Sequence, residues 1–171
     1  GQSYSPGMPL QPTADSTGWR FTFPAQDGVH YVTTPLSGSL VGRTRVQARF
    51  AIAGSGRLVP TQGAPPARVR LFFQRRDDTW AADHEFYRWW SVPSVELVVP
   101  GEHELKAALV PEQWFSVLGK RGDDPLGVGQ FAAAIADLQA VGQTFGGMFA
   151  GHGVYVVEGT ARFTLMSYEI V

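Results

Sequence analysis

The stretch that decides the fold is Thr44-Arg45-Val46-Gln47-Ala48-Arg49-Phe50-Ala51-Ile52-Ala53. Its largest apolar side chains fall at every second position, which are Val46, Phe50 and Ile52 with Ala48 between them. Successive side chains of a strand point to opposite faces of a sheet, so this alternation predicts a β-strand with one buried face. A strand of this kind is typical of an antiparallel sheet that packs one face on a core.

A second segment, residues 68–75, repeats the pattern, with Val69, Leu71 and Phe73 on one side of the expected strand. Two strands with the same alternation predict a common core. We therefore expect these three side chains to be buried together with the apolar face of residues 44–53.

Glycine and proline punctuate the rest of the chain into further short strands. We expect them at residues 19–23, 29–34, 86–91, 95–99, 104–110, 153–158 and 160–171. One helix is expected at residues 128–141, where Phe131, Ile135, Leu138 and Val141 recur at helical spacing. The pattern predicts an all-β protein: an antiparallel β-sandwich of jelly-roll type with one helix in a long connection. An up-and-down barrel is the alternative.

Composition limits the other possibilities. At 171 residues, the chain is expected to hold a single sandwich domain at 19–171, preceded by a flexible N-terminal arm at 1–18 that is rich in Pro, Ser, Thr and Gly. The net charge of −1 gives no electrostatic attraction to nucleic acid. No apolar run approaches the roughly 20 residues that a membrane span needs. We assign no cofactor or metal. The start of the chain resembles one trimmed after a signal peptide, so export to the periplasm or medium is expected, and the composition suggests a GC-rich, bacterial genome.

Aromatic residues are concentrated in one short segment, Trp80–Trp90, which holds three of the five tryptophans. Flat rings beside Asp, His, Glu and Arg are components of sugar and small-ligand sites, because a ring offers an apolar face and charges fix orientation. Alternation along the expected strand places Tyr87 with Trp89 on one face and Phe86, Arg88 and Trp90 on the other. One alternative is that both sets are buried, in which case Arg88 needs an acidic partner. Another is that the segment forms a protein–protein contact patch.

Polar side chains on the non-core faces of the two patterned strands form a second candidate surface. If the strands pair, Arg49, Arg70 and Gln74 share one face. Guanidinium and amide groups recognise hydroxyl and carboxylate groups. We expect this face to meet the Trp80–Trp90 segment with Tyr87 and Trp89 toward it. In the opposite phase, which is the alternative, Trp90 faces it instead. A solvated sheet face without a ligand is the alternative.

The order of the expected strands resembles the galactose-binding-like jelly rolls, which include many carbohydrate-binding modules. The resemblance depends on residues 19–23 and 28–32, on Arg45-Val46-Gln47-Ala48-Arg49-Phe50, and on the closing stretch 159–170. It implies a sandwich that binds a sugar. Such modules often carry a structural calcium, but the Asp and Asn cluster that would hold it is missing here.

Together these observations predict a non-catalytic domain of an exported protein that binds carbohydrate or a similar small polar ligand. The candidate ligand-binding residues are Arg49, Arg70, Gln74, Trp80, Asp83, His84, Tyr87, Trp89 and Trp90. Two alternatives remain. One is a glycoside-active enzyme that uses the cluster Asp83-His84-Glu85, and the other is a structural or assembly protein of the cell envelope.

Overall fold

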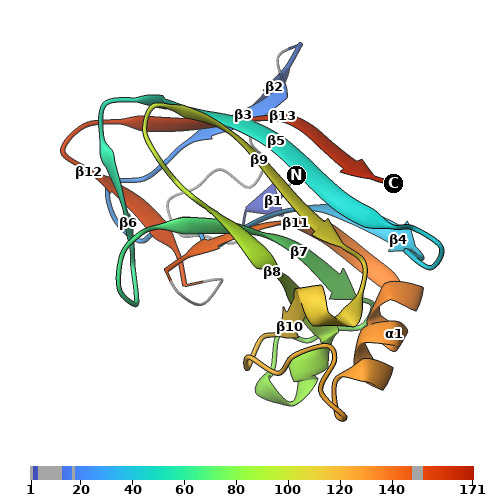
Figure 1. Ribbon diagram of the computed structural model, residues 1–171. Helices are drawn as coiled ribbons and strands as arrows, with labels where there is room; N and C mark the ends of the chain where they lie inside the picture. The colour runs from blue at the N-terminus through green and yellow to red at the C-terminus, as the bar shows by residue number, and fades with distance from the viewer. Residues whose placement is uncertain (1, 4–12, 17, 148–151) are drawn as a thin grey trace.

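Two antiparallel sheets packed face to face form the body of the protein in this computed structural model (Figure 1). The structure describes residues 2–3, 13–16, 18–147 and 152–171. Within them, the six-stranded sheet contains, in spatial order, β1 (Gln2–Ser3), β4 (Tyr31–Gly38), β11 (Leu138–Gly146), β7 (Arg68–Arg75), β8 (Arg88–Glu96) and β10 (Trp114–Ser116). The five-stranded sheet contains, within the same residues, β2 (Thr13–Asp15), β3 (Gly18–Thr22), β13 (Ala161–Ile170), β5 (Arg45–Gly54) and β9 (Gly101–Ala108).

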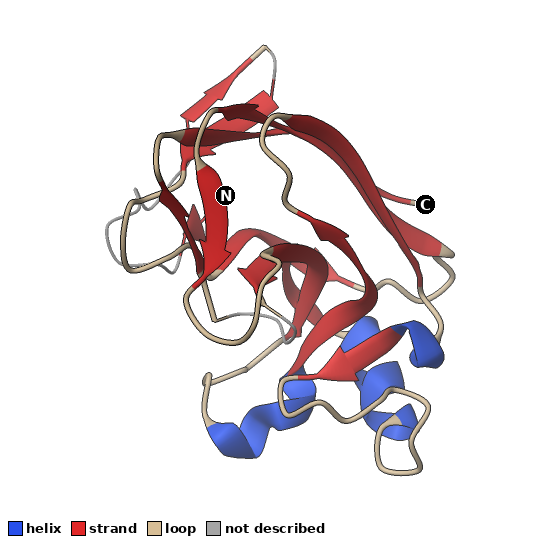
Figure 2. Cartoon of the chain, turned by 60° about the vertical axis from the view of Figure 1, so that its left-hand side comes forward, coloured by secondary structure: helices blue, strands red, loops and turns tan. Residues whose placement is uncertain are grey.

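The remaining elements close the two ends of the sandwich. A small sheet pairs β6 (Arg57–Pro60) with β12 (Val154–Val157). The α-helix α1 (Val128–Ala136) and the 3₁₀ segments η1 (Ala82–Tyr87) and η2 (Pro111–Gln113) gather at the opposite end, as Figure 2 shows. The predicted all-β sandwich with one α-helix is confirmed.

The core forms where the two sequence patterns indicated. β5 lies between β13 and β9, and β7 lies between β11 and β8, so both strands are central in their sheets. All the predicted core side chains are buried, namely Val46, Phe50, Ile52, Val69, Leu71 and Phe73. Aromatic rings fill much of the space between the sheets. Phe163 of β13 stacks on Phe21 at 5.1 Å and on Phe50 at 5.0 Å between ring centres.

The expected helix at residues 128–141 is too long. α1 ends at Ala136, and Leu138 begins strand β11, which is paired on both sides with β4 and β7. Hydrogen bonding to two neighbouring strands satisfies the backbone as fully as a helix does, so sheet pairing overrides the helical spacing of Leu138 and Val141. Both side chains are nevertheless buried.

The expected strand at 86–91 also begins too early, because residues 82–87 form η1. β8 then runs through Pro93 to Glu96, where two separate strands were expected. Pro93 lies where the β7–β8 register shifts, and the Ser91 hydroxyl there accepts a hydrogen bond from the Leu71 backbone N–H at 2.9 Å. A bulge tolerates proline because its residues leave the ladder of hydrogen bonds.

The N-terminal arm predicted at 1–18 contains strand structure in its described part. β2 pairs with β3, and β1 pairs with β4, so each lies at the edge of one large sheet. Residues 4–12 lie outside the described ranges.

Replacing Gly54 with alanine should destabilise the fold by about 1–3 kcal/mol. Gly54 ends β5 with φ +137°, and a Cβ there would collide with the Thr160 carbonyl oxygen. Gly129 is the matched control, because it lies in α1 and a Cβ there would have no neighbour within 4 Å apart from the adjacent residues and backbone of its own helix. Gly129→Ala should stabilise the protein by about 0.5–1 kcal/mol. Denaturant titration of both variants measures the difference, and equal effects would contradict the geometry of Gly54.

Candidate functional site

The aromatic segment Trp80–Trp90 is divided between the two faces of the six-stranded sheet. Trp89 points into the core and packs on Phe73 and Phe131, whereas Trp90 lies on the outer face with Tyr31 and Phe72. The exposed fractions of Trp89 and Trp90 are 0% and 3%. The expectation that Trp89 shares a face with Arg70 and Gln74 is therefore wrong. Trp90 occupies that face instead, and Tyr87 lies in η1 before the strand begins.

The polar surface expected from Arg49, Arg70 and Gln74 does not exist as one face. β5 and β7 belong to different sheets, so Arg49 and Arg70 lie on opposite outer sides of the sandwich. Arg49 is opposite Glu104 of β9 and Ser167 of β13. Because neighbouring strands supply the acids that β5 itself lacks, the outer face around Arg49 is a mixed-charge surface exposed to solvent.

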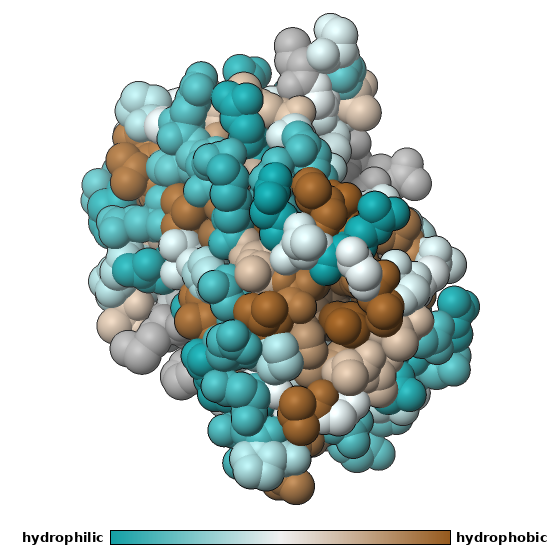
Figure 3. All heavy atoms as spheres, turned by 45° about the vertical axis from the view of Figure 1, so that its right-hand side comes forward, coloured by the Kyte–Doolittle hydropathy of each residue, from teal (hydrophilic) through white to brown (hydrophobic). Residues whose placement is uncertain are grey.

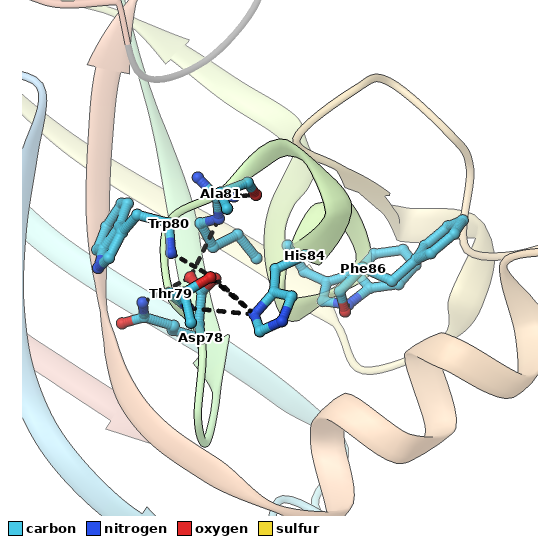
Figure 4. A network of polar contacts seen from close by, with 9 residues as sticks. Asp78, Thr79, Trp80, Ala81, His84 and Phe86 are labelled. Atoms are coloured by element: carbon cyan, nitrogen blue, oxygen red, sulfur yellow. Dashed lines mark hydrogen bonds and ion pairs between the residues drawn. The ribbon is translucent and has the colours of Figure 1, made fainter.

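A buried acid organises the segment that precedes β8 (Figure 4). The Asp78 carboxylate has no exposed surface and lies 3.1 Å from Nε of Arg88, whose side chain is 7% exposed. It also accepts hydrogen bonds from the Gln74 amide at 2.7 Å and from the Trp80 backbone N–H at 3.0 Å. The prediction that a buried Arg88 needs an acidic partner is confirmed. Gln74 and Arg88 thus hold the loop in place.

The other rings of the segment already have protein partners. His84 stacks on Tyr87 at 4.2 Å, and the Arg75 guanidinium lies 4.7 Å from the centre of the same ring. Trp80 packs on Tyr31 and Phe72, and Arg88 lies 5.2 Å from its ring centre. A sugar would need a ring face that these contacts do not use. Asp83 is exposed on η1.

Arg70 supports the bulge of β8. Its guanidinium donates to the Ser91 carbonyl oxygen at 2.9 Å and also to the Val92 carbonyl oxygen, and it lies over the Phe115 ring. Burial lowers the pKa of Arg70 to about 10. The Arg70 guanidinium thus binds two backbone carbonyl oxygens of β8, so its role in this structure is structural.

A cavity of about 290 Å³ opens between the two sheets on another side of the molecule. Its walls come from β4 and β11 of one sheet and from β3 and β13 of the other. The residues that line it are Trp19, Val32, Thr33, Thr34, Leu36, Val141, Gly142, Gln143, Leu165, Tyr168 and Ile170. We call it the β4–β13 cavity. Figure 3 turns this side of the protein forward and shows apolar atoms gathered on it.

One polar side chain in the wall of this cavity is buried without a partner. Gln143 is 1% exposed, and neither its amide nitrogen nor its amide oxygen has a hydrogen-bond partner in the described part of the chain. It alternates with Val141 and Phe145 on the core face of β11. An unpaired buried amide is costly, at about 1–3 kcal/mol. Native proteins satisfy nearly all such groups, so each exception requires a physical reason.

The cavity wall is otherwise neutral. Burial raises the pKa of the Tyr168 phenol, whose hydroxyl donates to the Gly142 carbonyl oxygen at 3.2 Å. The phenol is therefore uncharged at neutral pH, and no Asp, Glu, Lys, Arg or His is among the described residues that line the cavity.

Sequence reasoning missed Gln143. The signal is the alternation Val141-Gly142-Gln143-Thr144-Phe145, in which an amide takes a core position between two apolar side chains. It is hidden by the helical spacing that leads from Phe131 to Val141, because that spacing assigns the start of β11 to a helix.

Comparison with known proteins gives no assignment: no family model, no curated protein and no solved structure matches the chain. Among the described residues, no three His, Cys, Asp or Glu side chains group as metal ligands would. No helix within those residues has the length and apolar character needed to cross a membrane.

Proposed function

We propose that this protein is a non-catalytic binding domain that holds a small, mainly apolar molecule in the β4–β13 cavity. The observation that carries the proposal is the unpaired Gln143 amide in a mainly apolar, uncharged wall. Ligand pockets are typically apolar, with a few polar groups that fix orientation. An unpaired amide in a core position destabilises the fold. Hydrogen bonds from a ligand would offset this cost and so explain the presence of the amide.

The size of the cavity limits the ligand. A volume of about 290 Å³ lies at the lower end of small-molecule pockets, and at ~30 Å³ for each water in the liquid it equals the volume of about ten water molecules. A binding role fits the wall better than catalysis, since Tyr168 is its one ionisable group among the described lining residues and burial keeps it neutral. Carbohydrate binding and export stay predictions, and no contact of the Trp80–Trp90 segment adds support to them.

Toluene, as an apolar probe of suitable size, is expected to bind the protein and raise its melting temperature. Ile170→Trp should abolish both effects, because Ile170 is a half-buried wall residue that a larger ring would extend into the cavity. Val98→Trp is the matched control, since Val98 is exposed in the β8–β9 connection and lines no part of this cavity. Saturation-transfer NMR and thermal unfolding measure binding. If neither toluene nor benzamide binds, or if Ile170→Trp binds them unchanged, the proposal is wrong.

A further inference from the structure

We infer that the β4–β13 cavity selects an uncharged ligand that carries a hydrogen-bond donor and an acceptor side by side, of the carboxamide, lactam or protonated carboxylic acid class. The inference rests on the proposed function and names the chemistry of its ligand. It starts from the two unpaired atoms of the Gln143 amide, of which the nitrogen donates and the oxygen accepts. Both atoms are almost fully buried, so binding requires the Gln143 side chain to turn its amide toward the cavity.

The geometry of an amide determines which group completes it best. The nitrogen and oxygen of Gln143 are attached to one carbon, so a ligand group with the same spacing forms both hydrogen bonds at once, in parallel. A ketone or an ether can only accept, and an ammonium can only donate, so each leaves one atom of Gln143 unpaired. A site with buried polar groups discriminates strongly against analogues that leave those groups unpaired.

The wall of the cavity determines the charge of the ligand. Beside Gln143, its polar side-chain groups are the hydroxyls of Thr33, Thr34 and Tyr168 and the indole N–H of Trp19, all of them uncharged. The Tyr168 hydroxyl already donates to Gly142. A carboxylate or an ammonium would enter without a counter-charge among the described lining residues. Transfer of an unpaired ion into such surroundings is far more costly than transfer of a neutral amide. The acid form of a carboxylic acid can bind, but its anion cannot.

Four probes that share one benzene ring and differ in its substituent test the inference: toluene, benzamide, benzoate and benzylammonium. Wild-type protein is expected to bind benzamide about 10- to 100-fold more tightly than toluene, because two hydrogen bonds are added. At neutral pH, benzoate and benzylammonium should not bind measurably. Binding of benzoic acid should appear as the pH falls through the pKa of the acid itself, and its apparent affinity should drop tenfold for each pH unit above that pKa. Titration calorimetry and saturation-transfer NMR provide the affinities.

Gln143→Leu is the decisive variant, with Gln143→Met as a second substitution of similar volume. Both replace the amide with an apolar group, so both should lose the preference for benzamide and bind toluene at least as well as wild type. If toluene binds wild type but benzamide binds no more tightly, or if benzoate binds as well as benzamide at neutral pH, the inference is wrong while the proposed function stands. If none of the probes binds, the proposed function itself fails.

Discussion

Phe73→Ala is expected to lower the free energy of unfolding by about 3–5 kcal/mol. The Phe73 ring lies at the centre of the core between the sheets and the helical end, 4.7 Å from Trp114 and 5.9 Å from Phe131 between ring centres. Truncation removes these contacts and leaves a cavity that the central strand β7 cannot close, because β7 is held by β8 and β11 on both sides. Guanidinium titration followed by far-UV circular dichroism measures the change.

Leu126→Ala is the control for this measurement, since 72% of the Leu126 side chain is exposed before α1. Its effect should stay within about 0.5 kcal/mol, as for most surface substitutions. A change of less than about 1 kcal/mol for Phe73→Ala would mean that the buried face of β7 has been assigned to the wrong side.

Asp78→Ala is expected to destabilise the protein by a similar amount, about 3–5 kcal/mol, because it leaves the Arg88 guanidinium buried without its counter-ion. Gln74 and the Trp80 backbone N–H lose their acceptor as well. Denaturant titration of Asp78→Ala, Arg88→Met and the double variant forms a thermodynamic cycle. The double variant should be less destabilised than the sum of the single variants, since removing both charges leaves neither unpaired.

Asp137→Ala is the matched control, because Asp137 pairs with Arg76 on the surface, where the two side chains are 49% and 46% exposed. Exposed ion pairs contribute about 0–1 kcal/mol. Additive single effects in the Asp78–Arg88 cycle, or equal losses at Asp78 and Asp137, would show that the buried network does not hold the segment before β8.

Alternation predicted the core of β5 and β7 because each is a central strand with one face on the other sheet. In such a strand, the identity of the neighbouring strands has little influence on which positions are apolar. Burial of one face is enough to select apolar side chains at every second position. The sequence of residues 128–141 was ambiguous for the opposite reason. Leu138 and Val141 are buried in either structure, and only the pairing of β11 with two strands remote in sequence decides between them.

The candidate site was harder to predict, since the role of each side chain depends on a partner from elsewhere in the chain. The acid that faces Arg49 comes from β9, and the ring beneath Arg70 comes from β10. A list of aromatic and charged residues indicated a binding surface, but it did not show that many of these side chains also contact one another. The residue on which the proposed ligand site depends, Gln143, is a single amide between two apolar side chains of β11.

If the Gln143 amide in the core of β11 binds the proposed ligand, the folding equilibrium of the protein depends on the concentration of that ligand. A molecule that binds only the folded state adds RT ln(1 + [L]/Kd) to stability, which is about 2.7 kcal/mol at a hundredfold excess over Kd. With the proposed ligand, the chain would resist unfolding and proteolysis in proportion to the supply of that ligand. The lifetime of the protein would then depend on the concentration of the ligand, and copies without bound ligand would be degraded first.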